Sequence, residues 1–221
     1  MRRETAERRR PRRLSRWRPA ARPERDAPCS AGGTPAFLFI ALLALPLSAQ
    51  TLNEVRVVAV GGKSSTTWHG QADVQALQLE LGHALSPRTT VAIVAGAVNL
   101  WQPRSWFGNQ YGDGNESVHG LAASVLIRRA FFAHANVHPY VEGGTGPLIA
   151  EKRVPASTSR FNFITEAGAG IVLNANGRFP ILAGYRFMHI SNGGYSPRNP
   201  GLNVSAATIG VQIRNATRRQ R

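Results

Sequence analysis

The sequence predicts an all-β protein: an eight-stranded antiparallel up-and-down transmembrane β-barrel preceded by an export signal. Three observations predict this fold. Eight strand-like segments follow residue 50, and no helical period of useful length interrupts them. The connections between these segments alternate between short and long. Several segments also alternate apolar side chains with small or charged ones, as strands with two different faces do.

The chain begins with a basic leader. Its first 30 residues hold 11 arginines and 4 acidic residues, which leaves a charge of +7. Residues 35–46 form a short apolar segment followed by the small residues Ser48 and Ala49. This order is typical of a secretory signal peptide, and the segment is shorter than the roughly 20 residues of a transmembrane helix. We therefore assign residues 1–49 to a basic leader plus signal peptide. The leader is either an unusually long positive region of the signal or an over-extended start of the reading frame, and we favour the second explanation.

Composition excludes several classes of function. The one cysteine, Cys29, precedes the apolar segment, so disulfides, thiol catalysis and cysteine-bound metal are excluded from residues 50–221. A net charge of +15 is compatible with nucleic-acid binding. About half of this charge lies in the leader, ahead of the export-like segment, so we expect no nucleic-acid partner.

The predicted strands are rich in valine, isoleucine, alanine and glycine. They span residues 52–61, 72–82, 89–99, 117–132, 137–150, 160–173, 179–191 and 203–214. Short connections lie around residues 83–88, 133–136 and 174–178, and long ones around 62–71, 100–116, 151–159 and 192–202. This rhythm is typical of an outer-membrane barrel, although a soluble eight-stranded barrel shares it. We assign residues 50–215 to the barrel and 216–221 to a basic tail.

Side-chain alternation separates the two faces of the strands. In segments 72–82, 117–132 and 160–173 the odd positions are mostly apolar, whereas the even positions hold most of the glycines and the charges. Segment 89–99 is apolar on both faces. Because a narrow barrel needs small residues inside, we expect a polar, packed interior and a lipid-facing exterior. An isolated interior charge would cost several kcal/mol. The charges expected to pair inside are Glu80, Arg128, Glu142, Glu166 and Arg186.

The seventh segment carries the candidate site. Its odd positions end with Phe187, His189 and Ser191, so these side chains project from one lipid-facing side. If the first strand starts at the periplasm, this segment ends at the outer rim, level with lipid head groups. Asn203 opens the eighth segment, and antiparallel pairing across residues 192–202 is expected to bring it beside Ser191 and His189.

These residue types suit nucleophilic catalysis. An imidazole can remove the proton of a serine hydroxyl near neutral pH, which makes His189 a candidate base and Ser191 a candidate nucleophile. Asn203 is the candidate third member that orients the imidazole. The side-chain amide of Asn192 and the backbone N–H groups of the Gly193–Gly194 turn are the candidate donors to the developing oxyanion. A His-x-Ser pair alone is weak evidence, because most such pairs are inert.

The larger pattern resembles the PagL-type lipid A 3-O-deacylases, an acyloxyacyl-hydrolase-like family of outer-membrane proteins. The most specific part is YRFMHISNGG at residues 185–194 followed by NPGLN at 199–203, with support from PYVEGG at 139–144 and RFNF at 160–163. The resemblance covers most of residues 50–214. It implies an eight-stranded outer-membrane barrel that removes an ester-linked acyl chain from lipid A with a His–Ser–acid triad on its outer surface. It also implies His189 as base, Ser191 as nucleophile, and Asn192 with Gly194 around the oxyanion.

Two departures from the family bear on function. The family pattern has a glutamate where this chain has Asn203, which carries no charge but can hold the imidazole in one tautomer. We expect slower activity; a substitute acid or a relict site are the alternatives. The chain also ends in basic residues rather than the aromatic residue that often ends outer-membrane barrels, and this tail is expected to contact acidic lipid head groups.

We therefore predict an outer-membrane serine esterase that acts on lipid A of lipopolysaccharide. Its expected partners are this substrate and membrane lipids; no cofactor, metal, nucleic acid or protein partner is implied. Cations in or near the outward loops suit an anionic, phosphorylated substrate. They are Lys63, Arg104, Lys152, Arg153, Arg160 and Arg198. The alternatives are a non-catalytic structural or adhesive barrel with a relict site, and a soluble lipocalin-like carrier.

Overall fold

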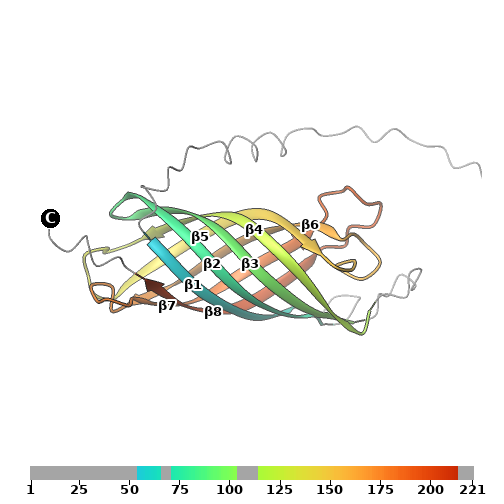
Figure 1. Cartoon of the computed structure of the whole chain (residues 1–221), viewed down its shortest axis with the longest axis horizontal. Helices are drawn as coiled ribbons and strands as arrows, with labels where there is room; N and C mark the ends of the chain where they lie inside the picture. Colours follow the sequence, from blue (N-terminus) through green and yellow to red (C-terminus); the bar gives the residue numbers. More distant parts are fainter. Residues whose placement is uncertain (1–53, 66–70, 104–113, 214–221) are drawn as a thin grey trace, which may run out of the picture. The chain divides into compact units, whose positions relative to one another are not determined.

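The structure, a computed structural model, describes residues 54–65, 71–103 and 114–213, which form a closed barrel (Figure 1). Its strands are β1 (Glu54–Ser64), β2 (Asp73–Ser86), β3 (Thr89–Gln102), β4 (Glu116–Ala130), β5 (His138–Ala150), β6 (Phe161–Leu173), β7 (Ile181–Ser191) and β8 (Leu202–Ile213). Each strand pairs antiparallel with the next, and β8 pairs with β1. The predicted fold class is confirmed. The predicted leader, signal peptide and basic tail lie outside the described residues.

All eight predicted strands are present, with boundaries shifted by a few residues. β2 continues to Ser86, whose Oγ accepts the backbone N–H groups of Arg88 and Thr89 and closes a very short turn. β4 ends at Ala130, two residues before its predicted end. Phe132 has a φ of 54°, a left-handed conformation in which an extended strand cannot continue. Within the described ranges, no helix is long and apolar enough to cross a membrane.

The half of the barrel nearer the short turns has a charged interior. Arg128 donates to Glu80 at 3.0 and 3.2 Å and to Glu142 at 2.9 and 2.7 Å. Arg186 donates to Glu142 at 2.9 and 2.7 Å and to Glu166 at 3.0 Å. All five side chains are buried, and each charge has an opposite partner. The predicted interior pairing is confirmed.

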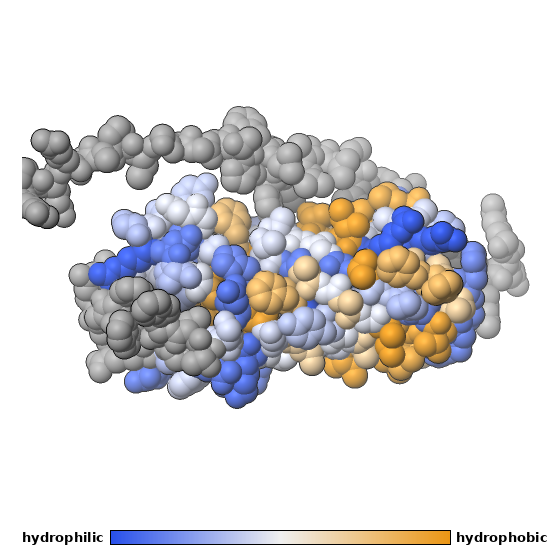
Figure 2. All heavy atoms as spheres, turned by 180° about the vertical axis from the view of Figure 1, so that it is seen from behind, coloured by the Kyte–Doolittle hydropathy of each residue, from blue (hydrophilic) through white to orange (hydrophobic). Residues whose placement is uncertain are grey.

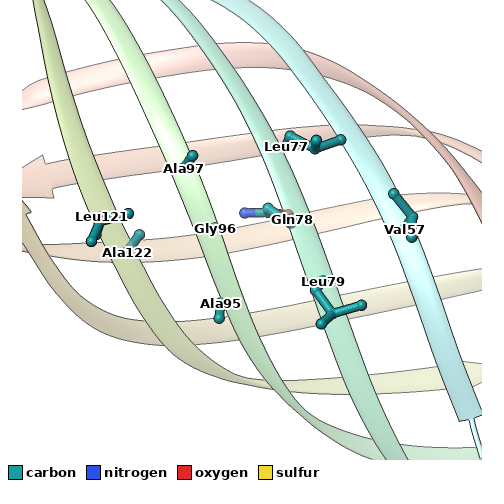
Figure 3. Close-up of a pocket in the computed structure, with 9 residues that line it drawn as sticks. All are labelled: Val57, Leu77, Gln78, Leu79, Ala95, Gly96, Ala97, Leu121 and Ala122. Carbon is teal, nitrogen blue, oxygen red and sulfur yellow. The ribbon is translucent and has the colours of Figure 1, made fainter.

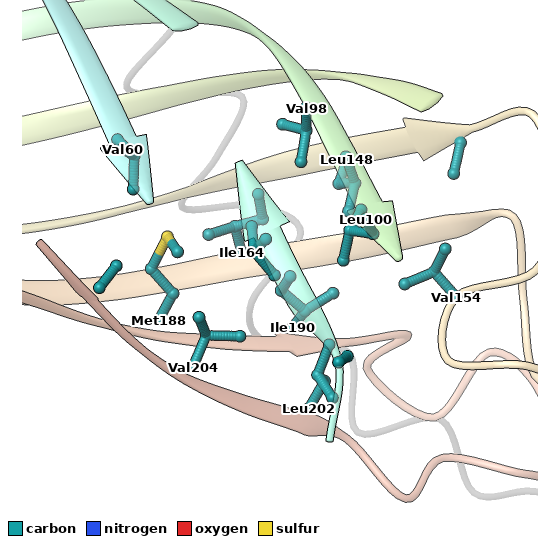
Figure 4. Close-up of a cluster of buried hydrophobic side chains, with 14 of the residues drawn as sticks. Val60, Val98, Leu100, Leu148, Val154, Ile164, Met188, Ile190, Leu202 and Val204 are labelled. Atoms are coloured by element: carbon teal, nitrogen blue, oxygen red, sulfur yellow. The ribbon is translucent and has the colours of Figure 1, made fainter. Parts of the chain in front are cut away.

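The half nearer the long loops has an apolar interior (Figure 4). Val154, from the connection between β5 and β6, is completely buried in this cluster. Residues labelled in Figure 4 are Val60, Val98, Leu100, Leu148, Val154, Ile164, Met188, Ile190, Leu202 and Val204. Because Met188, Ile190, Leu202 and Val204 point inward here, their neighbours along β7 and β8 must point outward.

The outer wall of the barrel is apolar over much of its area. On the face shown in Figure 2, hydrophobic side chains gather toward one end of the barrel. Exposed examples from four different strands are Leu77, Leu121, Ile149 and Ile209, each more than half exposed. An apolar wall around a filled polar and apolar interior matches a lipid-facing barrel. The predicted assignment of inner and outer faces is therefore confirmed.

Candidate active site

The loop ends of β7 and β8 bring three of the predicted residues together on the outer wall. Along β7, Met188 and Ile190 are buried, whereas His189 and Ser191 are partly exposed on the opposite face. Asn203 on β8 is exposed and is the register partner of His189. Strand alternation and register thus place all three where the sequence predicts them.

A hydrogen bond orients the imidazole. Nδ1 of His189 lies 2.7 Å from Oδ1 of Asn203. An amide oxygen can only accept, so Nδ1 carries the proton and donates it. The lone pair of the imidazole is then on Nε2, the atom suited to take a proton from a hydroxyl. Asn203 therefore sets the tautomer of His189 but contributes no charge.

Gly201 confines the imidazole on another side. Its φ is +68°, and a Cβ atom there would lie 2.8 Å from Cε1 and 3.4 Å from Nε2 of His189. Both the backbone conformation and the close approach therefore require glycine. Sequence reasoning assigned Gly201 no role, although the Pro200–Gly201 dipeptide marks a turn.

An aromatic cluster borders the candidate nucleophile. Ser191 pairs with Phe163 of β6. The ring of Phe163 lies 5.2 Å from that of Phe161 and 6.2 Å from that of Tyr195, measured between centroids. Gly193 packs on this cluster, because a Cβ there would lie 3.2 Å from the Phe163 ring. Ser191 therefore stands beside apolar rings suited to contact an acyl chain. The sequence analysis gave these rings no role, although the RFNF stretch that resembles the family holds two of them, Phe161 and Phe163.

The two predicted oxyanion donors are engaged in hydrogen bonds within the loop of residues 192–201. The side chain of Asn192, a residue only 1% exposed, donates from Nδ2 to the carbonyl oxygen of Arg198 at 2.8 Å. Its Oδ1 accepts the N–H of Gly194 at 2.9 Å. Oδ1 of Asn199 accepts the backbone N–H of Asn192 at 3.0 Å, a contact that sequence reasoning missed. The oxyanion role stays a prediction, and it requires the Gly194 N–H to turn away from Asn192.

A separate apolar hollow of about 490 Å³ lies over β1–β4 (Figure 3). Ala95, Gly96 and Ala97 of β3 form its floor, between leucines of β2 and β4. In this eight-stranded ring β3 is four strands from β7, so the hollow lies on the opposite wall and takes no part in the site.

The groups that the site offers are an imidazole, a hydroxyl and amides. Across the residues that the structure describes, no cluster of three or more His, Cys, Asp or Glu side chains is placed to hold a metal ion. An oriented imidazole near a hydroxyl can transfer a proton and so support attack on an ester carbonyl.

Comparisons with known proteins point to one family and support the barrel fold. The family model described as lipid A 3-O-deacylase (PagL) matches residues 64–212. The barrel is similar to the crystal structure of the outer membrane enzyme PagL, at 20% identity over 72% of this chain and 99% of that chain, with a TM-score of 0.50. It is also similar to Neisserial surface protein A (NspA), at 14% identity over 73% of this chain and 96% of that chain, with a TM-score of 0.53. No curated protein sequence matches significantly. At these identities the two structures support the fold alone.

Proposed function

The chain belongs to the lipid A 3-O-deacylase (PagL) family, and on this premise we propose that it is an outer-membrane serine esterase. It removes an ester-linked acyl chain from lipid A of lipopolysaccharide. The observation that carries the proposal is the 2.7 Å contact between His189 and Asn203, beside Ser191, on a barrel wall that is otherwise largely apolar.

The reaction proceeds through an acyl-enzyme. Nε2 of His189 takes the proton of Ser191 while Oγ attacks the ester carbonyl carbon. The tetrahedral intermediate collapses, the bond to the sugar oxygen breaks, and His189 returns the proton to that oxygen. Water then attacks the acyl-enzyme with His189 again as base, which releases the fatty acid and restores Ser191.

The position of the site suits this substrate. Ser191 is the last residue of β7, at the end of the barrel with the long loops, which face outward in outer-membrane barrels. The ester of lipid A joins its sugars to its acyl chains, so it lies between the head-group layer and the hydrocarbon. A hydroxyl at the outer edge of an apolar wall, such as that of Ser191, lies at the same depth as this ester.

The test is to replace Ser191 with alanine. Lipid A is analysed by mass spectrometry after expression in a host that lacks its own deacylase. We expect the unaltered protein to remove one acyl chain and Ser191→Ala to remove none. Ser117→Ala, which changes an exposed serine of β4, is the matched control and should retain full activity. If the unaltered protein and Ser191→Ala both leave the acylation of lipid A unchanged, the chain is a non-catalytic barrel with a relict site.

A further inference from the structure

A lysine lies on the outer wall beside the candidate active site. Lys63, near the end of β1, is the register partner of Ser205 on β8. Ser205 lies two residues from Asn203 on the same outward face. Adjacent strands are about 4.8 Å apart and rise about 3.4 Å per residue, so Lys63 and His189 are separated by roughly 12 Å between Cα atoms. A lysine side chain covers about half of this distance.

The wall between Lys63 and the site is polar. The hydroxyl of Ser205 shares a hydrogen bond of 2.9 Å with the hydroxyl of Tyr185 on β7. Asn203 continues this polar strip to His189. Polar groups on an otherwise apolar wall lie at head-group depth, because hydrocarbon solvates them poorly.

The ion pair that Lys63 forms within the protein is weak. Its ammonium group lies 3.4 Å from a carboxylate oxygen of Asp73, and the two side chains are 66% and 47% exposed. An ion pair this exposed contributes at most about 1 kcal/mol. A phosphate carries more charge than a carboxylate and offers three strong acceptor oxygens, so it would displace Asp73.

We propose that Lys63 binds a phosphate group on the sugar head group of the substrate and makes the enzyme prefer phosphorylated lipid. The inference rests on the proposed function and deepens it. With the ester at Ser191 and a phosphate at Lys63, the head group lies across β8 toward β1. Lys63 is thus a residue that determines specificity, with no part in the proton transfers.

The test compares Lys63→Gln with the unaltered protein on two substrates: phosphorylated lipid A and the same lipid after dephosphorylation. We expect kcat/KM for the phosphorylated lipid to fall about 10-fold, mainly through KM, since a hydrogen bond to a charged group is worth roughly this factor. For the dephosphorylated lipid, kcat/KM of Lys63→Gln should stay within about twofold of that of the unaltered protein. Lys63→Arg should keep most of the preference for phosphorylated lipid. Asp73→Asn should strengthen this preference, because it removes the carboxylate that pairs with the ammonium group of Lys63.

Lys152→Gln is the matched control. Lys152, the other lysine of the chain, lies on the connection between β5 and β6 and contacts Glu116 of β4. A general attraction of the rim for anionic lipid would be lost equally in both variants. Equal losses, or a Lys63→Gln loss of the same size on dephosphorylated lipid, would overturn the proposal.

A binding measurement separates this proposal from the proposed function. Phosphorylated lipid A is titrated into Ser191→Ala protein and into the Ser191→Ala, Lys63→Gln double variant. We expect about 10-fold weaker binding by the double variant. If the unaltered protein deacylates neither lipid, the proposed function fails, and this titration still decides whether Lys63 recognises phosphate. Equal affinities of the single and the double variant for phosphorylated lipid A would refute the proposal.

Discussion

Nδ1 of His189 lies 2.7 Å from Oδ1 of Asn203, across the register pair formed by β7 and β8. A carboxylate in place of the amide would accept the same hydrogen bond and add a negative charge. In the proposed mechanism, that charge would stabilise the imidazolium that forms when His189 takes the proton of Ser191. Asn203 therefore holds the imidazole of His189 in position without adding a charge beside it.

We predict that Asn203→Asp and Asn203→Glu raise kcat by about 10-fold or more, because they supply the missing charge. Aspartate has the length of asparagine, and glutamate restores the residue of the family pattern. Asn203→Ala should lower kcat by about 10-fold, because it leaves the imidazole without an orienting acceptor. The measurement is the single-turnover rate of fatty-acid release. Equal rates in all four proteins would show that Asn203 takes no part in the reaction.

Gly201 provides a second test of how the imidazole is held. A Cβ at this position would lie 2.8 Å from Cε1 of His189, and the backbone φ of +68° disfavours any other residue. We predict that Gly201→Ala lowers kcat/KM about 100-fold by displacing the base. Gly61→Ala is the control, because a Cβ there meets nothing within 4 Å, and its activity should be unchanged. Full activity of Gly201→Ala would contradict the tight packing around His189.

The buried charges inside the barrel contribute to its folding stability rather than to catalysis. Arg186 is completely buried and contacts Glu142 and Glu166. We predict that Arg186→Met destabilises the barrel by about 3–5 kcal/mol, because it leaves buried carboxylates without a partner. Equilibrium unfolding by denaturant in lipid vesicles measures the change.

Arg129→Met is the control for this effect. Arg129 neighbours the buried Arg128 but is exposed on the outer face, so its loss should change stability by no more than about 0.5 kcal/mol. Adding Glu142→Gln and Glu166→Gln to Arg186→Met should recover part of the lost stability, since neutral side chains remove the uncompensated charge. Unchanged unfolding of Arg186→Met would refute the role of the network.

Side-chain alternation in the sequence predicts much of this molecule. The shared face of Glu80, Arg128 and Glu142 predicts their pairing inside, and the period of two along β7 predicts that His189 faces outward. Alternation describes a strand and not the loop that follows it. The conformation of Asn192, which uses its side chain to bind Arg198 and Gly194, depends on loop contacts that no period encodes. The contact of Gly201 with His189 likewise depends on the path by which the loop of residues 192–201 joins β8.

The register of β6 against β7 yields the last prediction, which concerns the acyl chain. Phe163 pairs with Ser191, and its ring joins those of Phe161 and Tyr195 on the outer wall. A chain attached to the ester at Ser191 would run along these rings. We predict that Phe163→Ala lowers kcat/KM about 10-fold for a long-chain ester but less than about threefold for a short-chain ester, because only the long chain loses apolar contact. Phe132→Ala, which removes an exposed ring from a short turn at the other end of the barrel, should change neither value. An equal loss on both esters would mean that Phe163 acts by supporting the loop at Gly193 rather than by binding the chain.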